Sequence, residues 1–145
     1  MQQLDIEKLL GVYNLSNQGK WGKNDMLDYL QEDFFRRRNT CLCVWETSEG
    51  YQSALRLEPY RDSLLITALE TKPASRRKGY AQDLLNAVLE HLRHMQCTRL
   101  YSHVEKCNIP SLKLHQKCGF QIHSDTARYI DGTVTQNSYT LCREL

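Results

Sequence analysis

The sequence predicts an α/β fold in which helices and strands alternate along the chain. Apolar residues recur at helical spacing, with one stripe at positions 6, 9, 10 and 13 and a second at 26, 27, 30 and 34. Short apolar runs such as Leu64–Leu69 have the length of strands. Asp131-Gly132, late in the chain, is a pair typical of the turn in a β-hairpin.

The helices are predicted over residues 4–15, 24–37, 81–96 and 110–117. Asn24 or Asp25 has a side chain suited to cap the second of them. Pro110 suits the first turn of the fourth. Gly119 is the residue type that commonly follows a helix end, so this short helix is expected to close there.

The strands are predicted over residues 41–45, 51–57, 64–69, 99–105, 120–129 and 133–141. Ser48–Gly50 is expected to turn the first strand into the second, and Pro59–Asp62 to turn the chain into the third. In the strand over 99–105, His103 is expected on the face opposite Ser102.

The composition is that of an ordinary globular domain. The chain has 145 residues, of which 41% are hydrophobic and 25% charged, so we expect one domain over residues 1–145. No apolar stretch approaches the length of a bilayer span, and the first residues lack a basic region followed by an apolar core. These observations predict a cytoplasmic protein without a membrane partner.

Charge and cysteine content argue against a nucleic-acid-binding protein and against one held together by disulfides or a metal. The net charge of +2 is too small to indicate nucleic acid as a partner, and the basic residues gather locally at 36–38 and 76–78. The six cysteines contain no C-x-x-C pair. We expect reduced, mostly buried thiols and no metal site.

A basic, glycine-containing segment joins a predicted strand to a predicted helix. It reads Arg76-Arg77-Lys78-Gly79-Tyr80-Ala81. Such a turn aims backbone N–H groups and the positive end of the helix dipole at one point, and Gly79 lets an anion approach the main chain. The chain contains neither of the two common glycine-rich nucleotide fingerprints. The segment therefore predicts a different kind of phosphate cradle.

This cradle resembles the Arg/Gln-x-x-Gly-x-Gly/Ala signature of GNAT-superfamily N-acetyltransferases, with Arg76, Gly79 and Ala81 at its three positions. The segment from Asn108 to Phe120 resembles the family's other hallmark and begins 32 residues later (108 minus 76). The resemblance implies a mixed, mostly antiparallel central sheet flanked by helices on both faces. Family members usually open with a strand, whereas this chain opens with a predicted helix, so the sheet is expected to lack that strand or the chain to be trimmed.

The resemblance also implies that the chain binds acetyl-coenzyme A. The implied contacts come from the backbone of the strand before the cradle, from the cradle and from the second hallmark: Leu69, Glu70, Thr71, Arg76, Arg77, Lys78, Gly79, Tyr80, Ala81, Asn108, Ser111 and His115.

The candidate catalytic residues depart from the family's pattern. His115 stands where many members carry a tyrosine that protonates the leaving thiolate, and His103 where ribosomal-protein acetyltransferases carry a glutamate. Leu65 occupies the position of the histone-type glutamate, which leaves Glu70 as the nearby carboxylate. The alternatives are that His115 packs against the cofactor without chemistry and that His103 faces solvent.

Arg56 and Glu58 are weaker candidates, and their alternative is a solvated face. The implied activity is acetyl transfer from acetyl-coenzyme A to a primary amine of a small molecule or protein, by direct attack in a ternary complex. A non-catalytic acyl-coenzyme A-binding module on the same fold is the alternative. We expect a monomer or homodimer, and no residue pattern identifies the acceptor.

Overall fold

The computed structural model describes residues 41–61, 63–129 and 131–145. The two helices predicted before Cys41, and the question of a strand ahead of them, lie outside these residues. Within the described part, no helix is both long and apolar enough to cross a membrane.

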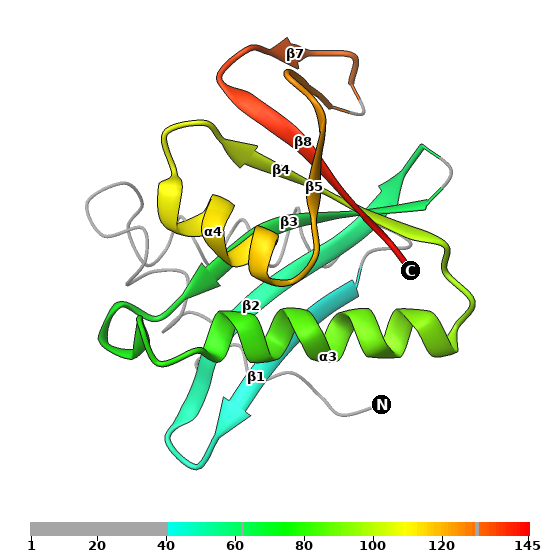
Figure 1. The fold of residues 1–145 in the computed structure, drawn as a ribbon. Helices are drawn as coiled ribbons and strands as arrows, with labels where there is room; N and C mark the ends of the chain where they lie inside the picture. Colours follow the sequence, from blue (N-terminus) through cyan, green and yellow to red (C-terminus); the bar gives the residue numbers. More distant parts are fainter. Residues whose placement is uncertain (1–40, 62, 130) are drawn as a thin grey trace. The chain divides into compact units, whose positions relative to one another are not determined.

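The described part of the chain opens with three strands, continues through a 3-10 helix, an α-helix, a strand and another α-helix, and ends with four strands (Figure 1). The strands are β1 (Cys41–Thr47), β2 (Gly50–Tyr60), β3 (Ser63–Thr71), β4 (Arg99–Glu105), β5 (Gln121–Ser124), β6 (Ala127–Arg128), β7 (Val134–Thr135) and β8 (Ser138–Glu144). The helices are the 3-10 helix η2 (Pro73–Ser75), α3 (Tyr80–His94) and α4 (Ile109–Lys117).

Six strands form one sheet in the order β1-β2-β3-β4-β8-β5, and β6 and β7 form a second, two-stranded sheet. β3 pairs with β4 in parallel, whereas β8 pairs with both β4 and β5 in antiparallel fashion. The predicted fold class, a mixed and mostly antiparallel sheet with helices, is confirmed.

The chain divides into two compact units. The first contains Met1–Arg56 and Ala68–Leu84, so its described part comprises β1, most of β2, the end of β3 and the start of α3. Tyr51 to Arg56 are all buried, as expected for a strand inside a sheet.

The second unit contains Leu57–Thr67 and Leu85–Leu145. Its part of α3 buries Leu85, Val88, Leu89 and Leu92, which are spaced as one face of an amphipathic helix. Each fully buried leucine contributes about 2 kcal/mol of hydrophobic stabilisation. The predicted strand over 99–105 is confirmed as β4, which pairs along its whole length with β8.

The terminal hairpin differs from the two continuous strands that were predicted. The Asp131-Gly132 turn is present, with Gly132 at φ +91° and the Thr133 amide donating to Asp131 Oδ1 at 2.9 Å. The first strand is interrupted between β5 and β6, where the Thr126 amide donates to Ser124 Oγ at 3.3 Å. Such local side-chain bonds compete with a strand ladder, which explains the break.

The predicted turn over 59–62 begins later than expected, because β2 continues to Tyr60. Tyr60 is buried and its hydroxyl donates to the Arg128 carbonyl at 2.7 Å. This bond spans a long sequence separation, and it holds the residue in the strand.

Candidate active site

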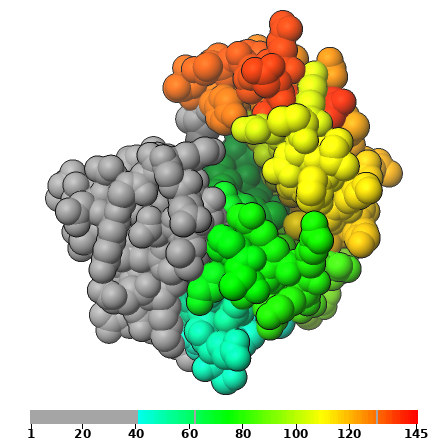
Figure 2. Space-filling view, turned by 90° about the vertical axis from the view of Figure 1, so that its left-hand side faces the viewer, coloured from blue at the N-terminus to red at the C-terminus, as the bar shows by residue number. Residues whose placement is uncertain are grey.

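The cradle lies between β3 and α3, at the surface of the first unit (Figure 2, green). Gly79 has φ +84°, a conformation that side chains rarely adopt. A Cβ built on Gly79 would have no atom within 4 Å, so the space beside its backbone is open. The cradle therefore has the open backbone approach that an anion needs.

The start of α3 supplies donors to this space. The Asp83 amide donates to the Gly79 carbonyl at 2.9 Å, which closes the first turn. The amides that precede it in the helix have no partner within the helix. Together with the helix dipole they favour a bound anion, and Arg77 and Lys78 are exposed beside them. The Arg76 side chain instead turns back, with Nε donating to the Thr71 carbonyl at 3.4 Å.

Two residues of β2, Gln52 and Ser53, bond to the chain on either side of the cradle through backbone and side-chain groups. The Gln52 carbonyl accepts from the Lys72 amide at 2.9 Å, and Gln52 Oε1 accepts a short hydrogen bond from Ser75 Oγ. Ser53 Oγ donates to the Tyr80 carbonyl at 3.1 Å. Sequence reasoning missed these supports, because β2 also carries an arginine and a glutamate, so two further polar residues in this strand did not stand out.

Leu69, Glu70 and Thr71 are the last residues of β3. The pairing of β3 with β4 covers Leu64–Ile66 and ends before Ala68, which has φ +53°. A positive φ at alanine is uncommon and bends the strand locally. The three residues follow this irregularity and lead into the cradle in the first unit.

In the second unit, Asn108 caps α4, with Oδ1 accepting from the Ser111 amide at 3.2 Å. This contact satisfies one of the amides left open at a helix start. Asn108 is exposed and Ser111 half-buried. The Asn108 amide group therefore keeps its NH₂ donors at the surface.

His115 is buried, with 1% of its surface exposed, and both ring nitrogens have partners. Nδ1 lies 2.7 Å from the Ser111 carbonyl, which only accepts, so Nδ1 carries the proton. Nε2 then accepts from Ser102 Oγ at 2.8 Å. Phe120 packs edge-on against the ring at 5.1 Å. Burial lowers the pKa of His115, against a smaller opposing effect of the Ser111 carbonyl, and so favours the neutral ring.

His103 is half-buried on β4 among aromatic rings. Its Nε2 lies 3.3 Å from the Tyr60 hydroxyl. Its Nδ1 is buried without a hydrogen-bond partner in the part of the chain that the structure describes. The pKa of His103 is lowered by burial and secondarily by the positive charge of Arg61.

Arg56 and Glu58 do not form a solvated face. Their side chains are 8% and 9% exposed, because β2 is an internal strand of the sheet. Leu65, at the position of the histone-type glutamate, is 1% exposed. Glu70 is half-buried.

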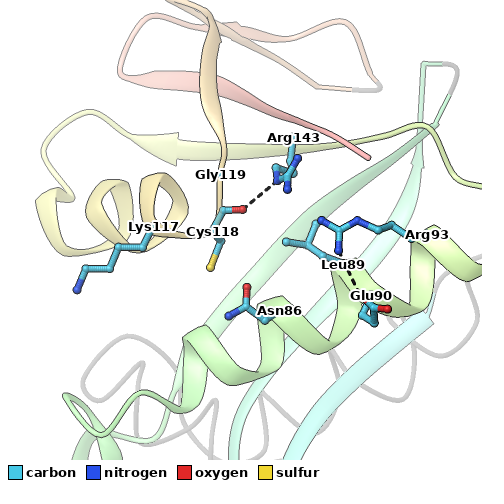
Figure 3. Close-up of a pocket in the computed structure, with 8 residues that line it drawn as sticks. All are labelled: Asn86, Leu89, Glu90, Arg93, Lys117, Cys118, Gly119 and Arg143. Atoms are coloured by element: carbon cyan, nitrogen blue, oxygen red, sulfur yellow. Dashed lines mark hydrogen bonds and ion pairs between the residues drawn. The ribbon is translucent and has the colours of Figure 1, made fainter.

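A pocket of about 370 Å³ lies between α3 and the end of α4 in the second unit (Figure 3). Cys118 points towards α3, and Asn86 of α3 points towards it. Arg143 Nε donates to the Cys118 carbonyl at 3.1 Å. No predicted site residue is among its lining residues, which are Asn86, Leu89, Glu90, Arg93, Lys117, Cys118, Gly119 and Arg143.

All six cysteines are free, as predicted. The expectation that most are buried is wrong, because only Cys118 and Cys142 are, whereas Cys41 and Cys107 are exposed. Burial, with the neighbouring Cys41, raises the pKa of Cys43 to about 12. Cys41 is the first residue of β1, and the four residues after it are half-buried, so its exposure reflects its place at the strand end.

A family model described as "Acetyltransferase (GNAT) family" matches residues 6–120. The chain belongs to this family. The match includes the cradle and the segment from Asn108 to Phe120, the two patterns from which the resemblance was inferred. The family places the chain among enzymes that transfer acyl groups.

Individual proteins agree with this assignment. An uncharacterized N-acetyltransferase of Bacillus subtilis, YvbK, is 24% identical over 119 residues, which are 78% of this chain and 75% of that protein. The ribosomal-protein-S18-alanine N-acetyltransferase of Escherichia coli has a TM-score of 0.72 at 12% identity, covering 99% of this chain and 90% of the other. A Bacillus subtilis acetyltransferase in complex with CoA has a TM-score of 0.66 at 18% identity, covering 100% and 95%. The two structures share the fold.

Proposed function

We propose that the chain transfers an acetyl group from acetyl-coenzyme A to a primary amine of a small molecule or protein. The observation that carries this proposal is the open backbone at Gly79, in a chain of the acetyltransferase family. An anion can reach the main chain there without meeting a side chain. A related acetyltransferase was crystallised with CoA, which supports the same cosubstrate for this chain.

The cradle residues fit the pyrophosphate of this cosubstrate. The amides at the start of α3 would bind its oxygens, and Arg77 and Lys78 would add positive charge. Arg76, Tyr80 and Ala81 complete the cradle. When bound, acetyl-coenzyme A supplies an activated thioester.

The remaining contacts are proposed from their places in the chain. The backbone groups of Leu69, Glu70 and Thr71 would form hydrogen bonds with the pantetheine arm. Asn108 would donate a hydrogen bond to the arm from its exposed NH₂ group. Ser111 would lie near the same arm, and the Glu70 side chain would shape the amine pocket.

The best-supported proton acceptor is His103. Its Nδ1 has no hydrogen-bond partner among the residues that the structure describes, and its lowered pKa keeps the ring neutral at physiological pH. A neutral imidazole can take the proton that the attacking amine loses.

His115 is less suited to proton transfer, because both of its nitrogens are already bonded within the fold. We propose that His115 positions α4 against β4 and contributes no proton.

The burial of His115 is also the observation that favours the alternative function. This position has no tyrosine to protonate the leaving thiolate, and the nitrogens of the buried His115 are already bonded within the fold. A chain without this proton donor would bind an acyl-coenzyme A and not turn it over. Thiol release decides between the two functions. Protein and acetyl-coenzyme A would be incubated with spermidine and an alanine-initiated peptide, which are suggested by the names of similar structures, and with a lysine peptide as a third primary amine. Binding without thiol release from any amine supports the binding module.

Replacement of Gly79 by valine tests the cradle directly. A side chain there would occupy the space beside the backbone, so we expect calorimetric affinity for coenzyme A to fall at least about tenfold, or 1.4 kcal/mol. Gly50→Val is the matched control, because Gly50 has φ +109° and equally open surroundings. Unchanged affinity in Gly79→Val, or an equal loss in the control, contradicts the assignment.

A further inference from the structure

The Tyr60 hydroxyl links a backbone carbonyl to His103. It donates its hydrogen to the Arg128 carbonyl at 2.7 Å, a normal distance for a strong bond. A hydroxyl has one hydrogen, so only its lone pairs remain for His103 Nε2 at 3.3 Å. Nε2 must therefore be the donor in this contact, and the ring carries its proton on Nε2.

This tautomer leaves Nδ1 as a bare lone pair. The atom is buried and has no hydrogen-bond partner among residues 41–61, 63–129 and 131–145. A buried polar group without a partner costs about 1–3 kcal/mol, and such groups are rare in folded proteins. A donor from a bound molecule would remove this cost.

Aromatic rings fix the orientation of His103. Tyr60 and Tyr129 pack edge-on against its ring, with centroids at 5.3 and 5.1 Å and interplanar angles of 87° and 80°. Tyr60 is itself edge-on to Tyr101 at 5.4 Å. All these residues belong to the second unit, so the arrangement stands within one compact body.

Four elements of the described part of the chain place titratable or charged groups around His103. Tyr60 ends β2 and Arg61 follows it, Tyr101 lies on β4 with His123 of β5 against it, and Tyr129 follows β6. Arg61 lies over the rings of Tyr60 and Tyr101, 5.3 and 5.7 Å from their centroids. Burial of the ring, and secondarily the charge of Arg61, lower the pKa of His103.

We propose that Tyr60 is a positioning residue that holds His103 in the Nε2-protonated tautomer, so that Nδ1 accepts the proton of the acceptor amine. This proposal rests on the proposed function. As the amine nitrogen forms its bond to the acetyl carbon and the carbon–sulfur bond breaks, one amine proton moves to Nδ1. That proton then passes to the departing sulfur or to water, and His103 returns to its neutral form.

Tyr60→Phe tests the proposal, because it removes the hydroxyl and keeps the ring. Tyr129→Phe is the matched control, since Tyr129 also packs edge-on against His103 but has no hydroxyl bond to it. Nitrogen-15 NMR of His103 distinguishes a protonated from a bare ring nitrogen without any substrate. We expect Nε2–H in the wild type and in Tyr129→Phe, and a mixture of the two tautomers in Tyr60→Phe.

Kinetics with the most active of the three amines completes the test. We expect kcat of Tyr60→Phe to fall roughly tenfold, a part of the 10²–10⁴-fold contributed by general base catalysis, with KM for acetyl-coenzyme A unchanged. Tyr60→Phe should add nothing to the loss in His103→Gln. A wild-type ring protonated on Nδ1, or an unaltered tautomer in Tyr60→Phe, overturns the proposal. A correct tautomer with full kcat in His103→Gln shows instead that the proposed base is wrong and that Tyr60 has only a structural effect.

Discussion

Replacing His115 by phenylalanine should destabilise the fold by about 2 kcal/mol. The ring of phenylalanine is similar in size but has no nitrogen, so Ser102 Oγ loses the acceptor that lies 2.8 Å away. Ser102 is 2% exposed, and water cannot replace that partner. A buried hydroxyl without a partner costs about 1–3 kcal/mol, and this cost dominates the change. The Ser111 carbonyl also loses its bond from the His115 ring. The cost there is smaller, because a carbonyl within a helix such as α4 still accepts from the amide four residues on.

A double-mutant cycle isolates this bond. Ser102→Ala removes the hydroxyl and leaves His115 Nε2 without its donor, so it should also be destabilising, by about 1–2 kcal/mol. In the double variant neither group is orphaned. We expect its loss of stability to be smaller than the sum of the single losses by about 1 kcal/mol or more.

Urea denaturation monitored by circular dichroism measures these changes, provided that the slope of the transition stays constant. The pH dependence gives a second measurement. Burial lowers the pKa of His115, so between its folded pKa and the unfolded value of about 6.5 the unfolded chain binds more protons. Wild-type stability should therefore fall as the pH drops below about 6.5, and less steeply in His115→Phe. A loss under about 0.5 kcal/mol, or strictly additive single and double variants, would refute the reasoning.

Two further predictions concern Gly119 and the thiols. A Cβ on Gly119 (φ +87°) would lie 2.5 Å from Arg143 Nε and would displace this side chain from its bond to the Cys118 carbonyl. Gly119→Ala should therefore lower the free energy of unfolding by about 2 kcal/mol, against about 1 kcal/mol for Gly132→Ala, where the φ is similar and the space open. Equal losses in urea denaturation would contradict this. Cys107 is exposed and Cys118 is buried with a raised pKa, so an aromatic disulfide reagent should modify Cys107 in the native protein and Cys118 only on unfolding; mass spectrometry showing the reverse order would contradict it.

Local patterns were enough to predict much of the fold. The strand over 99–105 alternates and is bounded by polar residues, and it was predicted with its observed ends. The helix predicted from Ala81 to Gln96 is α3, which begins one residue earlier and ends two residues earlier than predicted. The cradle was recognisable because its chemistry resides in consecutive residues.

The environments of the two histidines could not be predicted, because their partners are distant in sequence. His115 was predicted to protonate the leaving thiolate or to pack against the cofactor, and its hydrogen bond to Ser102 joins α4 to β4 instead. The contact between His103 and Tyr60 joins β4 to the end of β2. Arg56 and Glu58 were misjudged for a similar reason, since only the strand order shows that β2 is internal.

The pairing of β4 has a consequence for how the chain acquires its structure during synthesis. β8 pairs with β4 from Arg99 to Glu105, whereas β3 pairs only at Leu64–Ile66. Since the ribosome makes β8 after β4, the nascent chain presents β4 with one hydrogen-bonding edge still open. Open edges of apolar strands recruit other chains. Protection of this edge by a chaperone should therefore matter most while residues 106–137 are being added, and pausing in that interval should favour aggregation.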